Sequence, residues 1–175
     1  MFWLKIVRDF FKILREGQSP AQVAGGFALG SIVGLSPSLT LQGLLVWLVI
    51  FALNVNLAAA FLAFTLFSLF AWLLDPLFHL LGYTILVDLS SLRDLWTALY
   101  NAPIAPLTRF NNTVVMGSFV ASMLLALPIY AGMKRFVVAY RKHIGSKVEK
   151  WKLYQIIKKS ALVRWYERIR DLGGR

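Results

Sequence analysis

The chain alternates between long apolar stretches and short polar interruptions, and this pattern predicts membrane helices. Two stretches, residues 57–74 and 113–133, carry almost no polar side chains. Each is close to the roughly 20 apolar residues that a helix needs to cross the hydrocarbon core of a bilayer. The sequence therefore predicts an all-α integral membrane protein with two transmembrane helices at these positions.

Two shorter apolar stretches, residues 20–35 and 39–53, flank a Ser36-Pro37-Ser38 turn. A helix of about 16 residues reaches roughly 24 Å, which is less than the roughly 30 Å of hydrocarbon. The pair therefore predicts a helical hairpin. It could be re-entrant, dipping into the bilayer and returning, or it could consist of two tilted crossings. We favour the re-entrant form, in which protein or a wet cavity must cover the turn.

The rest of the chain is more polar. Residues 1–18 predict an amphipathic helix that lies in the membrane interface or packs on the protein's own body. Asp75-Pro76 is expected to end the first transmembrane helix, so residues 76–111 are assigned to an interfacial and periplasmic segment. Residues 134–175 mix basic and aromatic side chains and predict an amphipathic tail on the inner face of the membrane.

Positive charge is concentrated at the two ends of the chain. Of the 19 Lys and Arg residues, only Arg93 and Arg109 fall within residues 19–133. Because Lys and Arg stay on the cytoplasmic side, both termini are expected to be cytoplasmic. No nucleic-acid partner is expected, since the charge flanks apolar spans instead of covering a polar fold. Contact with anionic membrane lipids is expected from Lys134, Arg135, Lys158, Lys159 and Arg164.

Three glycines recur every fourth residue in the first helix of the hairpin. Gly26, Gly30 and Gly34 lie on one helix face and form a surface without side chains, here called the glycine ridge. Such a surface lets another helix backbone approach closely within a membrane. The neighbour is either another helix of this chain or a transmembrane helix of a partner.

Polar residues gather around the turn of the hairpin. They could line a small polar pocket or lipid path at membrane depth, as discontinuous helices do in transporters, or they could satisfy the backbone of the turn itself. The residues concerned are Ser36, Pro37, Ser38, Thr40 and Gln42.

Asp75 and His79 are four residues apart and would share a face if the helix continued through Pro76. An ionisable pair at the membrane boundary could bind a lipid head group or relay protons. Alternatively, Asp75 caps the next helix, because a proline that follows a cap fits the first helical position. We favour the cap.

Catalysis is not expected. The chain has no cysteine, which excludes disulfides, thiol nucleophiles and cysteine-based metal sites. No paired-carboxylate motif, phosphate loop, serine elbow or metal-ligand spacing is found along the sequence. We therefore expect neither a catalytic site nor a metal or other cofactor.

A string of motifs across residues 19–82 resembles a known bacterial family. The string reads SPAQVAGGFALGSIVGLSP from Ser19, followed by Gln42, by LNVN at 53–56, by Asp75-Pro76 and by Leu81-Gly82. It resembles the bacterial membrane family called domain of unknown function twenty sixty-two. That family has an Asn-Pro where this chain has Asp75-Pro76.

The length and the basic tail look like one subgroup of that family, short stand-alone proteins of bacteria with outer membranes. These are often encoded beside a larger envelope protein. The resemblance implies an inner-membrane protein with a dedicated partner that has a transmembrane helix, and it transfers no catalytic residue. We hypothesise a subunit that anchors or gates the larger protein in moving phospholipid or another lipid between membranes.

Two alternatives stay open. The chain could be an autonomous small transporter, channel or lipid scramblase, acting as a homo-oligomer with the hairpin as its path. A weaker alternative is a membrane-surface organiser that acts through its basic tail.

Overall fold

The structure, a computed structural model, describes residues 18–37 and 40–144. The chain divides into two compact units, Met1–Val137 and Val138–Arg175. The predictions for residues 1–17 and 145–175 lie outside the described part of the chain. Within that part every regular element is a helix and no strand occurs, so the expected all-α fold is confirmed there.

The first described helix, α2 (Pro20–Leu35), begins at a complete capping box. The Ser19 hydroxyl accepts a hydrogen bond from the backbone N–H of Gln22 at 3.2 Å. The side-chain Oε1 of Gln22 accepts one from the backbone N–H of Ser19 at 2.8 Å. These two bonds satisfy backbone donors that the first turn of a helix leaves free. Ser36 then turns extended and ends the helix.

The second helix of the hairpin is α3 (Leu41–Ala52), which begins two residues later than predicted. Thr40 has an extended backbone, and its hydroxyl accepts a hydrogen bond from the Gly43 amide at 3.3 Å. Threonine therefore caps this helix instead of joining it. The Trp47 ring packs on Phe61 and Phe64 of the next helix, with ring centroids 4.9 and 5.6 Å apart.

The longest apolar element is α4 (Leu57–Tyr83), capped by Asn56. The expectation that Asp75-Pro76 ends it is wrong, since Pro76 lies inside the helix. Proline removes one backbone donor and disfavours a helix interior, yet α4 continues on both sides of Pro76. Residues 76–83 therefore extend α4 and do not begin an interfacial segment.

A connector of short elements follows α4. It contains a π turn η1 (Thr84–Asp88), a 3-10 turn η2 (Ser90–Leu92), the helix α5 (Arg93–Tyr100) and a second 3-10 turn η3 (Ala105–Thr108). Arg109, at φ 54°, ends η3 in the left-handed region. The connector brings the chain to the start of the last long helix.

That last helix, α6 (Thr113–Ala139), begins where the sequence predicts. It passes Met133, the predicted end, and continues into a π turn η4 (Tyr140–Ile144). Lys134 and Arg135 therefore lie within the helix. Both residue types have high helix propensity, so a change from apolar to basic composition does not stop a helix.

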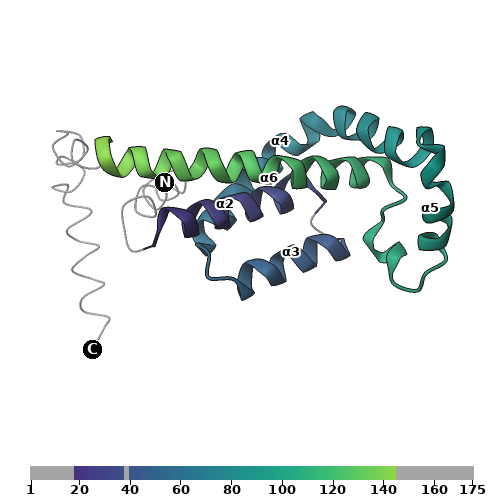
Figure 1. The fold of residues 1–175 in the computed structure, drawn as a ribbon, viewed down its shortest axis with the longest axis horizontal. Helices are drawn as coiled ribbons and strands as arrows, with labels where there is room; N and C mark the ends of the chain where they lie inside the picture. The colour runs from purple at the N-terminus through teal and green to yellow at the C-terminus, as the bar shows by residue number, and fades with distance from the viewer. Residues whose placement is uncertain (1–17, 38–39, 145–175) are drawn as a thin grey trace. The chain divides into compact units, whose positions relative to one another are not determined.

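Helix α4 is the centre of the arrangement within residues 18–137. Its first half runs parallel to α2, because Gly26, Gly30 and Gly34 face Asn56, Ala60 and Phe64 in that order. Its second half runs antiparallel to the start of α6, where Gly117 faces Phe78 and Gly82 faces Thr113. Figure 1 shows α2 and α6 beside α4, with α3 on the other side of α2 from α6.

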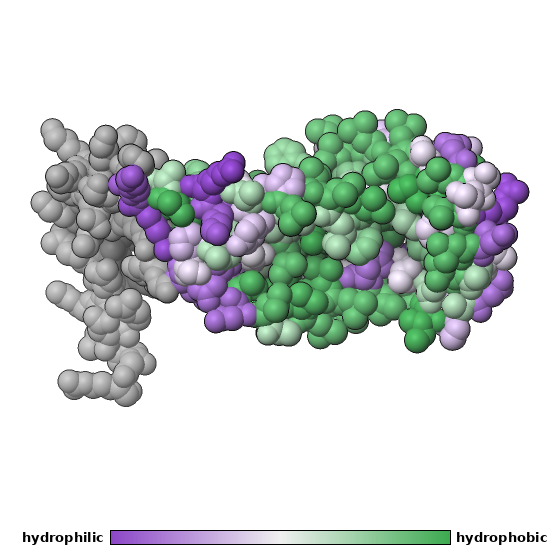
Figure 2. Space-filling model, in the orientation of Figure 1, coloured by the Kyte–Doolittle hydropathy of each residue, from purple (hydrophilic) through white to green (hydrophobic). Residues whose placement is uncertain are grey.

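Within residues 18–37 and 40–144, two segments are long and apolar enough to cross a membrane, Leu57–Asp88 and Thr113–Lys142. Only 17% and 22% of their most apolar windows are buried within the protein, so neither is an ordinary core helix. Figure 2 shows hydrophobic residues over the middle of the molecule's visible face and hydrophilic ones over the connector. Length and composition point to association with a membrane.

Candidate functional site

The glycine ridge is covered by α4 of the same chain. A Cβ atom added at Gly30 would clash with the backbone of Ala60, and one at Gly26 with the backbone of Asn56. At Gly34 it would come within 2.8 Å of the Phe64 carbonyl oxygen. The ridge therefore allows backbone-to-backbone packing of α2 and α4, and this face is not open to a partner's helix.

A second glycine contact joins α4 to α6, and the sequence analysis missed it. A Cβ atom at Gly82 would clash with the Thr113 carbonyl, and one at Gly117 with the Phe78 carbonyl. Each of these glycines is isolated in its own helix, so no repeat marks them. Only the pairing of two distant helices reveals that they face each other.

The polar turn of the hairpin contacts α6 through Ser36, which is buried, whereas Pro37 is exposed. The Ser36 and Ser122 hydroxyl oxygens are 3.3 Å apart, and Ser122 is fully buried. Ser36, Thr40, Gln42 and Ser122 are here called the polar cluster; Ser38 lies outside the described residues. Ser122 was not predicted, because it is 86 residues from Ser36.

Members of the polar cluster differ in how they are satisfied. The Thr40 hydroxyl donates to the Pro37 carbonyl at 2.9 Å and caps α3, so it serves the backbone of the turn. The Gln42 side chain is 9% exposed, and its Oε1 atom has no hydrogen-bond partner among the residues that the structure describes. A buried amide oxygen without a donor costs about 1–3 kcal/mol, so this atom is the chemically unusual point of the cluster.

Asp75 does not cap a helix, because α4 continues past it. The expected cap is therefore wrong, for the same reason that the predicted end of α4 is wrong. Asp75 and His79 are one turn apart on α4, as their spacing predicts for a continuous helix. The His79 ring is engaged with α6, since its Nδ1 atom lies 2.7 Å from the Thr113 hydroxyl oxygen.

The structure describes two of the five residues that are predicted to contact anionic lipids. Lys134 and Arg135 are exposed on α6, and the Lys134 ammonium lies 5.9 Å from the centre of the Tyr130 ring. This distance is within the range of a cation–π contact. Lys158, Lys159 and Arg164 lie outside the described residues.

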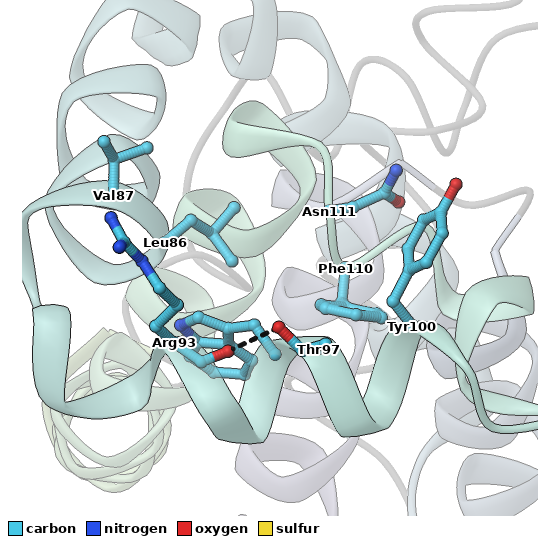
Figure 3. Close-up of a pocket in the computed structure, with 8 residues that line it drawn as sticks. Leu86, Val87, Arg93, Thr97, Tyr100, Phe110 and Asn111 are labelled. Atoms are coloured by element: carbon cyan, nitrogen blue, oxygen red, sulfur yellow. Dashed lines mark hydrogen bonds between the residues drawn. The ribbon is translucent and has the colours of Figure 1, made fainter.

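The connector forms an open pocket of about 390 Å³, here called the cavity, that the sequence analysis did not anticipate. Three of its lining side chains, Arg93, Thr97 and Tyr100, come from one side of α5 and are visible in Figure 3. Their spacing of four and three residues was available in the sequence, but α5 is too short to stand out by its pattern. The cavity is lined by Leu86, Val87, Arg93, Trp96, Thr97, Tyr100, Phe110 and Asn111.

Among the residues that the structure describes, no group of three or more His, Cys, Asp or Glu side chains could hold a metal ion.

Comparison with known proteins identifies the family. Residues 5–144 match the family described as "Uncharacterized protein conserved in bacteria (DUF2062)". The chain belongs to this family. It is also 29% identical, over 161 residues, to an uncharacterised protein of Treponema pallidum (strain Nichols), covering 92% of this chain and 99% of that relative. No solved structure matches the chain.

The motif residues of this DUF2062 chain lie mainly at the contact of α2 with α4. The glycine ridge provides the close approach. Asn56 caps α4 through its side chain. Its backbone N–H donates to the backbone carbonyl of Gln22 at 3.0 Å. The residues that carry the resemblance therefore have packing and capping roles in the structure.

Proposed function

We propose that this protein is a multi-pass protein of the bacterial inner membrane with both termini in the cytoplasm. The support is the large apolar surface left exposed on α4 and α6. Trp72, Leu124 and Leu127 are 71%, 70% and 76% exposed, and each stands among other exposed apolar residues. Soluble monomers rarely expose apolar patches of this extent, whereas lipid or a membrane partner would cover them.

The hairpin of α2 and α3 is proposed to be re-entrant. Gly34, near the end of α2, faces Phe64, which is in the first half of α4. Because α2 and α4 are parallel and Gly26 lies level with Asn56, α2 begins before α4, and the turn after α2 lies about a third of the way along α4. Ser122 approaches the same turn from within α6. Ser36 and Thr40 at this turn are buried within the protein, as a membrane requires of irregular backbone at such a depth.

As its function, the protein is proposed to anchor or gate a larger envelope protein in lipid trafficking between membranes. The exposed apolar surface of α4 and α6 carries this proposal, because it can accept lipid chains or a partner's transmembrane helix. The glycine ridge cannot serve that purpose, since α4 occupies it. Membership of this bacterial family also supports the proposal, because its short members are expected to be encoded beside larger envelope proteins.

The test is extraction of the tagged full-length chain from its native membrane in a lipid-retaining polymer, followed by mass spectrometry. A larger envelope protein at fixed stoichiometry, together with bound phospholipid, is expected. Depletion of this chain should then slow the delivery of labelled phospholipid to the outer membrane. Recovery of the chain alone, with unchanged delivery on depletion, would refute the proposal.

A second candidate is an autonomous lipid scramblase or transporter, and the buried Gln42 oxygen favours it. A polar atom without a partner at membrane depth could contact a passing head group. If so, the reconstituted chain alone should move a fluorescent phospholipid between leaflets, and Gln42→Leu should slow it. Thr65→Val is the control, because the Thr65 hydroxyl bonds only to its own helix at Phe61. Equal rates in liposomes with and without the protein would exclude this candidate.

A further inference from the structure

The connector cavity lies where the second half of α4 and the start of α6 meet. Because these helices are antiparallel, residues 84–112 join their ends on one side. In the topology proposed above, that side faces away from the cytoplasm. In this topology the cavity therefore lies at the periplasmic surface of the inner membrane, at the depth of the phospholipid head groups.

The aromatic wall of the cavity is held in place by specific contacts. The Trp96 indole N–H donates to the Ile85 carbonyl at 3.2 Å. Its ring lies 5.9 Å from the ring of Phe110, which is only 8% exposed. Ile85 belongs to the π turn η1, and irregular turns of this kind often occur at functional sites. The wall is thus preformed and does not depend on a ligand.

Arg93 supplies a positive charge to the cavity. No carboxylate of the described chain forms an ion pair with its guanidinium, although Asp94 is its neighbour in sequence. In Figure 3 this guanidinium lies beside Val87 at one end of the cavity. Tyr100 and Asn111 line the other end, and in the view of Figure 3 the Phe110 ring lies between the two ends.

We propose that this cavity binds the phosphodiester of a phospholipid head group. Arg93 holds the phosphate, because a guanidinium matches two phosphate oxygens with paired hydrogen bonds. Tyr100 and Asn111 hydrogen-bond the polar group beyond the phosphate. This inference rests on the proposed function in lipid trafficking. It adds a lipid-binding site on the periplasmic leaflet of the inner membrane.

A lipid fits the cavity better than a free phosphate ion does. A free ion needs several polar donors around it, whereas Leu86, Val87 and Phe110 make much of this wall apolar. Val87 at the edge of the cavity is 49% exposed, and Leu80, seven residues earlier in the chain, is 63% exposed. Acyl chains could follow these exposed apolar side chains while the head group stays in the cavity.

The experiment titrates the full-length protein in detergent with phosphatidylglycerol and counts bound lipid by native mass spectrometry. Arg93→Gln is expected to weaken the tightest binding event about tenfold, since a charge-assisted pair of hydrogen bonds is lost. Arg93→Lys should recover part of the affinity. Arg109→Gln, which removes the same charge from the same connector but outside the cavity, should bind as the wild type does.

Two further ligands separate the sources of the phosphate. Glycerol phosphate, which has no acyl chains, should not compete, and diacylglycerol, which has no phosphate, should bind equally to wild type and Arg93→Gln. Equal affinity of both arginine variants for phosphatidylglycerol, or full competition by glycerol phosphate, would overturn the proposal. Normal melting of Arg93→Gln establishes that any loss is not unfolding.

The outcome separates this site from the function on which it rests. Binding that depends on Arg93, in a chain that extracts without a partner and whose depletion leaves lipid delivery unchanged, would keep the site and refute the proposed function. A partner complex with impaired delivery on depletion, but with wild-type binding by Arg93→Gln, would keep the function and refute the site.

Discussion

Two glycines in the long helices show how differently the same residue can act. Gly30 faces the Ala60 backbone with no room for a Cβ atom. At Gly132 on α6, by contrast, no atom of another element in the described part of the chain lies within 4 Å of that position. Gly30→Ala is therefore expected to push α2 from α4 and to destabilise the protein by about 1–3 kcal/mol. Gly132→Ala should be neutral or gain about 0.5–1 kcal/mol from helix propensity. Thermal unfolding in detergent measures both, and equal midpoints would contradict the packing described here.

Ser36 and Ser122 give a second test at the scale of single residues. Their hydroxyls meet between the end of α2 and the middle of α6. Single alanine variants and the double variant form a thermodynamic cycle, whose coupling energy is expected near 0.6 kcal/mol, the average for hydrogen bonds inside membrane proteins. Chemical unfolding in mixed micelles supplies the energies. Strict additivity of the two variants would mean that the hairpin turn does not bond to α6.

At the scale of elements, the length of α4 depends on the helix continuing through Pro76. Alanine there restores a backbone hydrogen bond, and Pro76→Ala should therefore stabilise the protein by about 1–3 kcal/mol. If the helix ended at Asp75 instead, Pro76 would suit a first helical position and its loss would bring no gain. Pro103→Ala, outside any helix in the connector, is the control and should show no gain. Differential scanning calorimetry of the three proteins distinguishes the two cases.

At the scale of the whole molecule, the absence of cysteine allows topology to be mapped with single introduced cysteines. In membrane vesicles, Ser91→Cys in the connector should react with an impermeant maleimide only from the outer side, and Asn54→Cys only from the inner side. Pro37→Cys, at the hairpin turn, should react only after detergent is added. Labelling of Pro37→Cys from the outer side would show that the hairpin consists of two crossings. Labelling of Ser91→Cys and Asn54→Cys from the same side would contradict the proposed topology.

The sequence alone correctly predicted the helical class, the start of α2 at Pro20, the start of α6 and the family. Apolar periodicity and capping act over a few residues, so they can be read locally. The errors arose where a local signal was outweighed by the surrounding helix. Asp75-Pro76 resembles a helix boundary, yet the long apolar helix continues through it.

The tertiary structure alone decided which surfaces meet and which remain open. The glycine ridge was visible in the sequence, but that α4 fills it depends on the parallel course of two helices. Gly82, Gly117 and Ser122 gain their roles only because distant segments pack together. The connector cavity likewise needs η1, α5 and the residues before α6 to converge. Composition and spacing fix local structure over a turn or two of chain, whereas contacts between residues far apart depend on the packing of all the helices at once.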